Sequence, residues 1–273
     1  MPDSGRGVAL VRLPGERLAE GIVTHLERAA VDVSLARRQH QAYVAALSTA
    51  GWRVVAVPEA PDHPDAVFVE DTVVVVDDLA VLTRPGAPQR RGEVEGTRAA
   101  VTALGLRVVE LAAAGFGAPP TLDGGDVLQV GRRVYVGRGG RTNADGVRAL
   151  RDLLAPLART VVLVPLDGVL HLKSALTALP DGTLIGLPGR LDAAGLPGLR
   201  VAPEEPGAHV VPLGDGSLLM AASAPRTAAW LDQLGFDVVT VDIGEFEKLE
   251  GCVTCLSVLV PAPAPAVVLT PPR

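Results

Sequence analysis

The stretch VFVEDTVVVVDDLAVL, residues 67–82, contains the pattern from which the fold of this chain is predicted. Two apolar runs flank the pair Asp77-Asp78, and a short acidic turn between apolar runs is typical of a β-hairpin. The same pattern of apolar run, turn rich in Gly, Asp or Pro, and second apolar run recurs at residues 127–136, 174–185, 209–222 and 253–269. We therefore expect five hairpins along the chain.

Amphipathic helical patterns separate these hairpins, at residues 31–50, 92–104, 143–157 and 224–234. Most of them precede a short apolar run that predicts a further strand, at residues 52–57, 106–111, 160–166 and 236–241. The repeating unit is therefore hairpin, helix and strand (ββαβ), present about five times.

Two arrangements of alternating helices and strands compete. A doubly wound sheet needs single parallel strands, whereas hairpins form antiparallel pairs. The sequence also contains no G-x-G-x-x-G and no P-loop motif, so a nucleotide cleft has no support. We predict an α/β fold in which five ββαβ modules close into a five-bladed propeller with pseudo-fivefold symmetry, as a single domain over residues 1–273.

The composition is that of an ordinary globular protein, with 48% hydrophobic and 21% charged residues and a net charge of -6. The acidic excess argues against nucleic acid or membrane partners, because both bind basic surfaces, and it favours a cationic small molecule. The only cysteines, Cys252 and Cys255, exclude a disulfide-stapled secreted scaffold. With neither a signal peptide nor an apolar stretch of about 18 residues, a cytoplasmic protein is expected.

Cys255 lies in VTCLSVLV, residues 253–260, which predicts a buried strand. It could be a small core residue. Cys252 and Cys255 form a C-x-x-C, but zinc would need a second ligand pair, which the sequence lacks. A thioredoxin-type redox pair belongs at a helix start, whereas these cysteines precede or enter a predicted strand. The remaining interpretation is a nucleophile that needs a histidine and a carboxylate from elsewhere.

His171 is the best-placed partner, because it opens a predicted hairpin between Leu170 and Leu172. A core histidine bonded to a backbone carbonyl is an equally good interpretation of the same pattern.

Carboxylates interrupt the apolar pattern at two places. Glu70 and Asp71 lie inside an apolar run, where unpaired charges are costly, so they need a cationic partner or a function. Neighbours in a regular strand point to opposite faces, so both serve one pocket only near a bulge or a strand end. In LDGGDV, residues 122–127, a tight glycine turn is expected to present Asp123 inward. Capping of turns is the alternative role for such acids.

Two loops carry arginines, at residues 83–91 and 139–143. An arginine there can form bidentate hydrogen bonds to a carboxylate, although such residues more often lie on the surface as solvated charges.

Together these segments resemble the dimethylarginine dimethylaminohydrolase family, within the guanidine-modifying enzymes. The resemblance covers nearly the whole chain, and its motifs occur in the family's order. They are VALVRLP (8–14), ARRQHQ (36–41), FVED (68–71), TRPGAP (83–88), LDGGDV (122–127), RTN (141–143), LHLKS (170–174) and TCLSV (254–258).

The resemblance implies a five-bladed fold and hydrolysis of methylated arginine to citrulline and an amine, without metal or organic cofactor. It implies Cys255 as nucleophile, His171 as general acid and base, and Asp123 as the residue that orients His171. The implied substrate-binding residues are Leu13, Asp65, Phe68, Glu70, Asp71, Arg90, Arg141 and Leu249. Two positions depart from the family's animal members: Glu250 replaces an Asp, and Cys252 replaces an aliphatic residue.

Other activities of the same superfamily stay open at this point. An arginine deiminase would act on unmethylated arginine, although such enzymes carry an added helical domain that this sequence lacks. An amidinotransferase would pass the amidino group to an amine, and a non-catalytic protein would only bind methylarginine. A monomer and a homodimer are equally compatible with the sequence.

Overall fold

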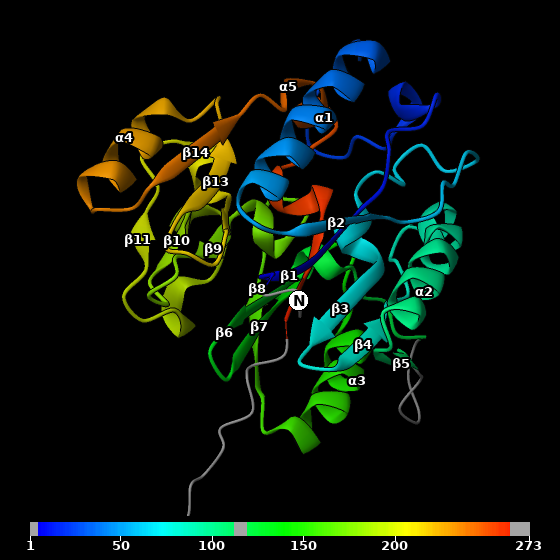
Figure 1. The fold of residues 1–273 in the computed structure, drawn as a ribbon. Coiled ribbons are helices and arrows are strands. Elements are labelled where there is room, and N and C mark those ends of the chain that lie inside the picture. Colours follow the sequence, from blue (N-terminus) through cyan, green and yellow to red (C-terminus); the bar gives the residue numbers. More distant parts are fainter. Residues whose placement is uncertain (1–4, 112–118, 263–273) are drawn as a thin grey trace, which may run out of the picture.

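The computed structural model describes residues 5–111 and 119–262, and in this part of the chain fifteen strands form five separate three-stranded sheets (Figure 1). Sheet by sheet, the strands are β1 Gly7–Val11, β2 Arg53–Ala56 and β15 Val258–Pro261; β3 Val73–Val76, β4 Leu79–Leu82 and β5 Arg107–Glu110; β6 Val127–Val130, β7 Arg133–Arg138 and β8 Thr160–Pro165; β9 Leu176–Ala178, β10 Leu184–Gly186 and β11 Arg200–Val201; β12 Val210–Pro212, β13 Leu218–Ala221 and β14 Val238–Val241. No continuous parallel sheet forms among the described residues, so the doubly wound alternative is wrong.

All five sheets are mixed in the same way. The central strand pairs antiparallel with one neighbour and parallel with the other, as β4 does with β3 and β5. Four of the predicted hairpins are confirmed as the pairs β3–β4, β6–β7, β9–β10 and β12–β13.

The fifth predicted hairpin is described only in its first half, and it remains a prediction. Strand β15 comes from its first half, yet it pairs antiparallel with β1, with Ala9 opposite Leu259. The expected second strand, residues 266–269, lies outside the described residues. Segments from the two ends of the chain thus share one sheet, which a pattern read along the sequence does not reveal.

Helices cross between the central and third strands of four sheets: α1 Val33–Thr49, α2 Val94–Ala103, α3 Ala144–Leu154 and α4 Pro225–Gln233. Asp32 caps α1 by accepting the Leu35 N–H at 2.9 Å, and Asn143 caps α3 by accepting the Gly146 N–H at 2.8 Å. Between β10 and β11 the expected helix is absent, and two 3-10 turns, Pro188–Arg190 and Ala193–Gly195, take its place. The Pro- and Gly-rich sequence of residues 188–198 explains this difference. A short helix, α5 Gly244–Glu247, was not predicted.

A 3-10 turn precedes the first strand of each sheet that contributes to the site. These turns are Val69–Thr72 before β3, Gly124–Asp126 before β6, Leu172–Ser174 before β9 and Val253–Leu256 before β15. Glu70, Asp71 and Cys255 therefore lie in turns and not in regular strands, which corrects the prediction. In a turn, neighbouring side chains are not forced to opposite faces, so the objection raised for Glu70 and Asp71 disappears.

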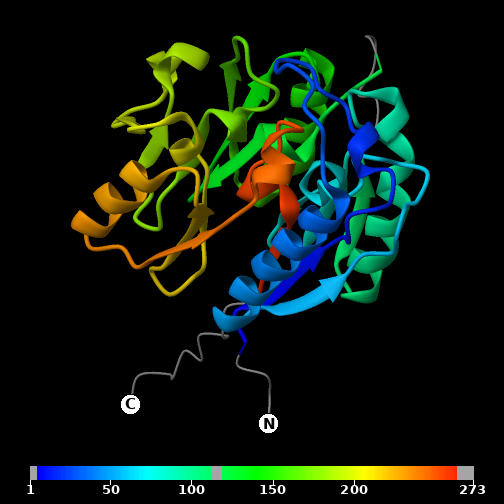
Figure 2. The ribbon, with the colours of Figure 1, turned by 90° about the horizontal axis from the view of Figure 1, so that it is seen from above.

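Neighbouring sheets contact one another through their first strands, as β15 does with β3, β6 with β9, and β9 with β12. Seen from above, the orange-red segment that leads into β15 lies between the sheets, with the helices toward the outside (Figure 2). A cavity of about 440 Å³ is lined by residues of all five first strands. Among the described residues, no helix is both long and apolar enough to cross a membrane.

Candidate active site

A narrow pocket lies where the 3-10 turns before β3, β9 and β15 meet. Its lining residues are Ile22, Asp65, Phe68, Asp71, Arg90, Arg141, Leu170, His171, Leu249, Glu250, Gly251 and Cys255. Eight of the eleven residues expected in the site belong to this lining. The pocket therefore unites segments that are more than a hundred positions apart in the sequence.

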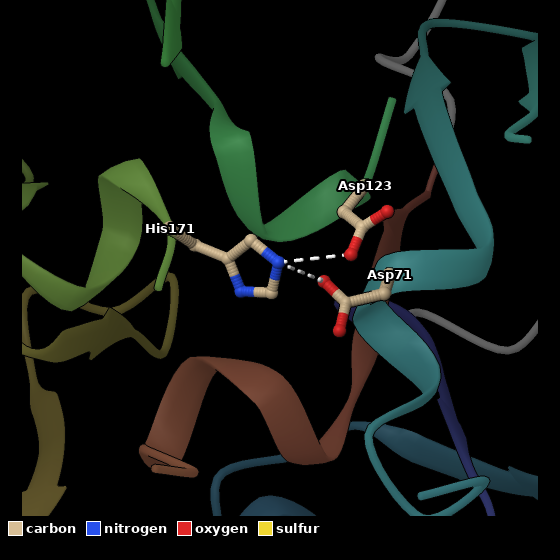
Figure 3. Close-up of side chains that lie close together, drawn as sticks. All are labelled: Asp71, Asp123 and His171. Atoms are coloured by element: carbon tan, nitrogen blue, oxygen red, sulfur yellow. Dashed lines mark hydrogen bonds and ion pairs between the residues drawn. The ribbon is translucent and has the colours of Figure 1, made fainter. Parts of the chain in front are cut away.

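The Nε2 atom of His171 faces two carboxylates, those of Asp123 and Asp71, which belong to the turns before β6 and β3 (Figure 3). This atom is 3.0 Å from Asp123 Oδ2 and 3.8 Å from Asp71 Oδ1. Asp123 is completely buried behind the pocket, and its Oδ1 accepts the Gly86 N–H at 2.8 Å. The contact expected between Asp123 and His171 is therefore present in the structure.

The charges around His171 favour its cationic form. Burial lowers the pKa of His171, but Asp71, Asp123 and Asp126 outweigh burial and raise it to about 9. Burial likewise opposes the charge of Asp71, yet His171 and Arg90 hold the pKa of that carboxyl well below its usual range. At neutral pH the site thus contains an imidazolium next to ionised carboxylates, a state suited to donating a proton.

Gly124 and Gly125 allow this turn to approach its neighbours closely. A Cβ on Gly125 would lie 2.8 Å from His171 Nδ1 and 2.7 Å from Asp71 Oδ1, and one on Gly124 would lie 2.0 Å from the Glu70 carbonyl oxygen. The Gly125 N–H donates to Asp71 Oδ1 at 2.9 Å. The two glycines are therefore required for space around the site, since neither adopts a positive φ.

The two arginines of the pocket differ in how many of their N–H groups already have a hydrogen-bond acceptor. Arg90 is fully engaged: it is 2.6 Å from Asp71 Oδ2 and 2.7 Å from Glu93 Oε2, and it also donates to the carbonyl oxygens of Asp65 and Phe68. Arg141 Nη1, by contrast, has no hydrogen-bond partner within residues 5–111 and 119–262 and lies 3.6 Å from Asp123. Arg141 is therefore the better placed of the two to receive an anionic group.

Cys255 is 5% exposed and lies beside the second cysteine, with 3.3 Å between the two sulfur atoms. The hydrogen bond to Cys252, together with burial, raises the pKa of the Cys255 thiol, and Glu70 and Asp71 add to this effect. A further positive charge close to this sulfur opposes the rise and favours the thiolate.

Three expected site residues lie elsewhere. Leu13 is 52% exposed and lies outside the pocket lining, so its expected role there is not supported. Glu70 faces the 440 Å³ cavity and pairs with Lys173 at 2.5 Å. Burial raises the pKa of Glu70 to about 8 although Lys173 opposes this. Asp123, the third, lies outside the lining and contacts two residues of it, His171 at 3.0 Å and Arg141 at 3.6 Å.

Ile22 lines the pocket but was not among the predicted site residues. Its N–H donates to the carboxylate of Asp65, at 3.0 and 3.2 Å from the two oxygens. A Cβ on Gly21 would lie 2.9 Å from the same carboxylate. The glycine at this position is therefore the feature of the sequence that could have indicated a close contact here. Residues 21–32 form no strand or α-helix, and no motif marks them. Glu250, noted only as a departure from a family pattern, also lines the pocket.

Asp71, Asp123 and His171 could also serve as metal ligands, because their ligand atoms lie within 4.8 Å of one another. Each oxygen of the two carboxylates, however, already contacts a protein donor or His171. A bound cation would have to displace these contacts, so the arrangement fits an imidazolium better than a metal ion.

Comparison with known proteins identifies close relatives, although no family model matches the chain. N(G),N(G)-dimethylarginine dimethylaminohydrolase of Streptomyces coelicolor is 58% identical over 251 residues, which cover 92% of this chain and 95% of the relative. The solved structure of DDAH from Pseudomonas aeruginosa, a cysteine-to-serine mutant complexed with citrulline, has a TM-score of 0.84 at 31% identity. A dimethylarginine dimethylaminohydrolase adduct with S-methyl-L-thiocitrulline also has a TM-score of 0.84, at 30% identity. Both structural matches cover 94% of this chain and 100% of the other.

Proposed function

The chain belongs to the dimethylarginine dimethylaminohydrolase family, and on this basis we propose that it hydrolyses asymmetric dimethylarginine and monomethylarginine. The products are citrulline and dimethylamine or monomethylamine. The observation that carries the proposal is a buried cysteine in one pocket with a histidine that two carboxylates keep cationic. The relatives solved with citrulline and with a thiocitrulline adduct support this substrate class.

Binding of the substrate begins with its positive charge. The carboxylates of Asp65 and Asp71 line the pocket and offset the guanidinium charge. Asp65 is already bonded to the Ile22 N–H, so it can bind the substrate and hold the neighbouring segment together. Phe68 supplies an apolar wall. Glu70 is paired with Lys173 outside the lining, so it is not placed to contact the guanidinium.

The remainder of the substrate requires polar contacts at the other end of the pocket. Arg141 is the proposed partner of the α-carboxylate, because its Nη1 is buried without an acceptor among the described residues. Arg90 holds Asp71 and Glu93 in position and acts on the carboxylate only through its charge. The Leu249 carbonyl remains the proposed acceptor for the α-amino group, with Ile22 in the role expected of Leu13.

The chemical step starts when the bound cation favours the thiolate of Cys255, and the thiol proton is released to solvent. The thiolate attacks the guanidinium carbon, which forms a C–S bond and a tetrahedral adduct that is close to neutral. His171 then gives its proton to the departing amine, the C–N bond breaks, and an S-alkylthiouronium remains on Cys255. Asp123 keeps His171 oriented for this transfer.

Hydrolysis regenerates the enzyme. His171, now neutral, takes a proton from water as the water oxygen attacks the thiouronium carbon. The C–S bond then breaks, the hydroxyl of this second adduct gives its proton to the departing Cys255 sulfur, and the ureido group of citrulline forms. Cys255 and His171 thereby return to their starting protonation states. No step uses a metal or organic cofactor.

For the overall architecture we propose a five-bladed α/β propeller with approximate fivefold symmetry that forms one domain. Five mixed sheets with the same strand pattern support this arrangement, and so does a cavity lined by all five first strands. The partner is a cationic small molecule, and a cytoplasmic monomer or homodimer remains our expectation.

The assay for this function uses asymmetric dimethylarginine, monomethylarginine, arginine and agmatine, with ureido product and released amine both measured. Turnover of the two methylated substrates is expected. Cys255→Ser should abolish turnover with the fold intact by circular dichroism, while Cys252→Ser retains it. Turnover of arginine alone would make the protein a deiminase, and no turnover of any substrate would contradict a hydrolase.

A further inference from the structure

The second cysteine of the C-x-x-C has no part in the proposed reaction, yet it lies against the nucleophile. The two sulfur atoms are 3.3 Å apart, and both side chains are buried. The separation is shorter than an ordinary van der Waals contact between sulfur atoms and needs only a small movement to reach the roughly 2.05 Å of a disulfide bond. The chain contains no other cysteine, so any thiol chemistry of this protein belongs to this pair.

The local backbone supports a bond between these residues. Cys252 is the N-cap of the 3-10 turn Val253–Leu256, and the Cys255 N–H donates to the Cys252 carbonyl at 3.0 Å. The cysteines therefore lie at the start of a helical turn, which is where redox C-x-x-C pairs occur. The sequence pattern predicted a strand there and argued against a redox pair, and the structure removes that objection.

Access to the pair comes from the substrate side. Cys255 lines the pocket with His171 and Asp71, whereas Cys252 is not part of that lining, although both cysteines belong to one hydrophobic cluster. A small neutral oxidant that enters the pocket therefore meets Cys255 first. The hydrogen bond from Cys255 lowers the pKa of Cys252, so the inner sulfur is suited to attack an oxidised neighbour.

We propose that Cys252 and Cys255 form a reversible disulfide that switches the enzyme off under peroxide and protects its nucleophile; the inference rests on the proposed function of Cys255. Peroxide transfers one oxygen to the Cys255 sulfur, giving a sulfenic acid and one water. The Cys252 thiolate then attacks that sulfur, the S–S bond forms, and the sulfenic oxygen leaves as a second water. Overall, two thiols lose two electrons and two protons, and one peroxide becomes two waters.

The disulfide has two consequences for the enzyme. While it exists, Cys255 has no thiolate with which to attack a guanidinium. A small dithiol reductant restores both thiols by exchange. Without Cys252, the sulfenic acid at Cys255 stays exposed to further peroxide and proceeds to the sulfinic acid, which such reductants do not reverse.

The test treats the full chain with a small excess of hydrogen peroxide and records intact mass, alkylatable thiols and methylarginine turnover. In the wild-type protein we expect a mass loss of about 2 Da, the loss of both alkylatable thiols and a proportional loss of turnover. Dithiothreitol should restore the mass, the thiols and the turnover. Cys252→Ser is the matched variant: it should gain about 32 Da and lose turnover that dithiothreitol does not restore. Cys255→Ser should show no loss of 2 Da.

Mass and thiol content do not depend on turnover, so they test the disulfide even if the substrate assignment fails. A wild-type protein that gains 32 Da without losing 2 Da would overturn the proposal. Recovery of Cys252→Ser equal to that of the wild type would do the same, as would a disulfide that links two chains on a non-reducing gel.

Discussion

Buried charges determine much of what single residues do in this site. His171, Asp71 and Asp123 are all buried, and their mutual attraction raises the pKa of His171 to about 9. The ordinary pKa of the side chain is 6.5, so the folded protein binds this proton more tightly than the unfolded chain does.

This difference predicts how stability depends on pH. The pKa of His171 is raised in the folded state. The stabilisation that its protonated side chain gives the folded protein is therefore complete below about pH 6.5, and it is lost as the pH rises through about 9. We expect the free energy of unfolding to fall by on the order of 3 kcal/mol over this window. Urea unfolding at several pH values measures it, with His171→Gln as the control. An equally steep fall in that variant would show that other groups are responsible.

The two pocket arginines should respond differently to substitution. Arg141→Ala is expected to raise KM for methylarginine with a smaller effect on kcat, because a buried donor for the α-carboxylate is lost. An analogue that lacks the α-carboxylate should be unaffected. Arg90→Ala should instead cost about 3–5 kcal/mol of stability, because Asp71 and Glu93 lose their shared cation.

Steady-state kinetics and urea unfolding of both variants distinguish these effects, with Arg38→Ala on the exposed face of α1 as the control. If Arg90→Ala folded normally and only raised KM, Arg90 would be a direct carboxylate ligand.

At the level of elements, Glu250 connects the C-terminal turn to the irregular segment that covers the pocket. Its carboxylate accepts the N–H groups of Thr24 and Leu26, at 3.0 and 2.9 Å, and that of His25. Glu250 adopts a φ of 62° to reach them, which is a costly conformation for a side chain of this kind. Two carboxylates, those of Glu250 and Asp65, thus accept hydrogen bonds from backbone N–H groups of this segment.

Removing that carboxylate should loosen the segment. In Glu250→Ala we expect amide exchange at residues 24–26 to accelerate by about tenfold or more, since hydrogen bonds to a charged group are lost. KM should rise in parallel. Hydrogen exchange and kinetics measure both, with Glu250→Gln, which keeps one acceptor oxygen, expected to lie between. Unchanged exchange at these amides would mean that Asp65 alone holds the segment.

For the whole molecule, the pairing of β15 with β1 determines how the chain unfolds. This sheet joins a strand near residue 7 to one near residue 261, and β15 also contacts β3 of the next sheet. We expect one cooperative transition, with equal calorimetric and van't Hoff enthalpies, as for a single domain. Two separate transitions would contradict this.

A chain that ends after Ser257 lacks β15 and leaves β1 without its antiparallel partner. It should show no cooperative transition in the same calorimetric scan. A matched chain that ends after Ala262 retains β15 and should keep a cooperative transition.

Most elements were predictable from local patterns. Four hairpins, four helices and the strands after them follow from apolar periodicity, turn residues and caps such as Asn143. Residue types singled out Cys255, His171 and Asp71 as candidates, and these three line one pocket, but their chemical roles were implied only by the resemblance to a family. Local patterns succeed here because burial and backbone conformation repeat with the period of each element.

Tertiary packing alone decided the remaining features. The sequence could not indicate that β15 pairs with β1 or that Lys173 pairs with Glu70. Nor could it indicate that Arg90 uses its N–H groups in contacts with protein acceptors, whereas Arg141 Nη1 has no hydrogen-bond partner among the described residues. It also could not show that Ile22, and not Leu13, reaches the pocket, or that the two cysteine sulfurs touch. These features depend on which distant groups meet, and a charge or a thiol acquires its partner only when the packed sheets bring the partner within reach.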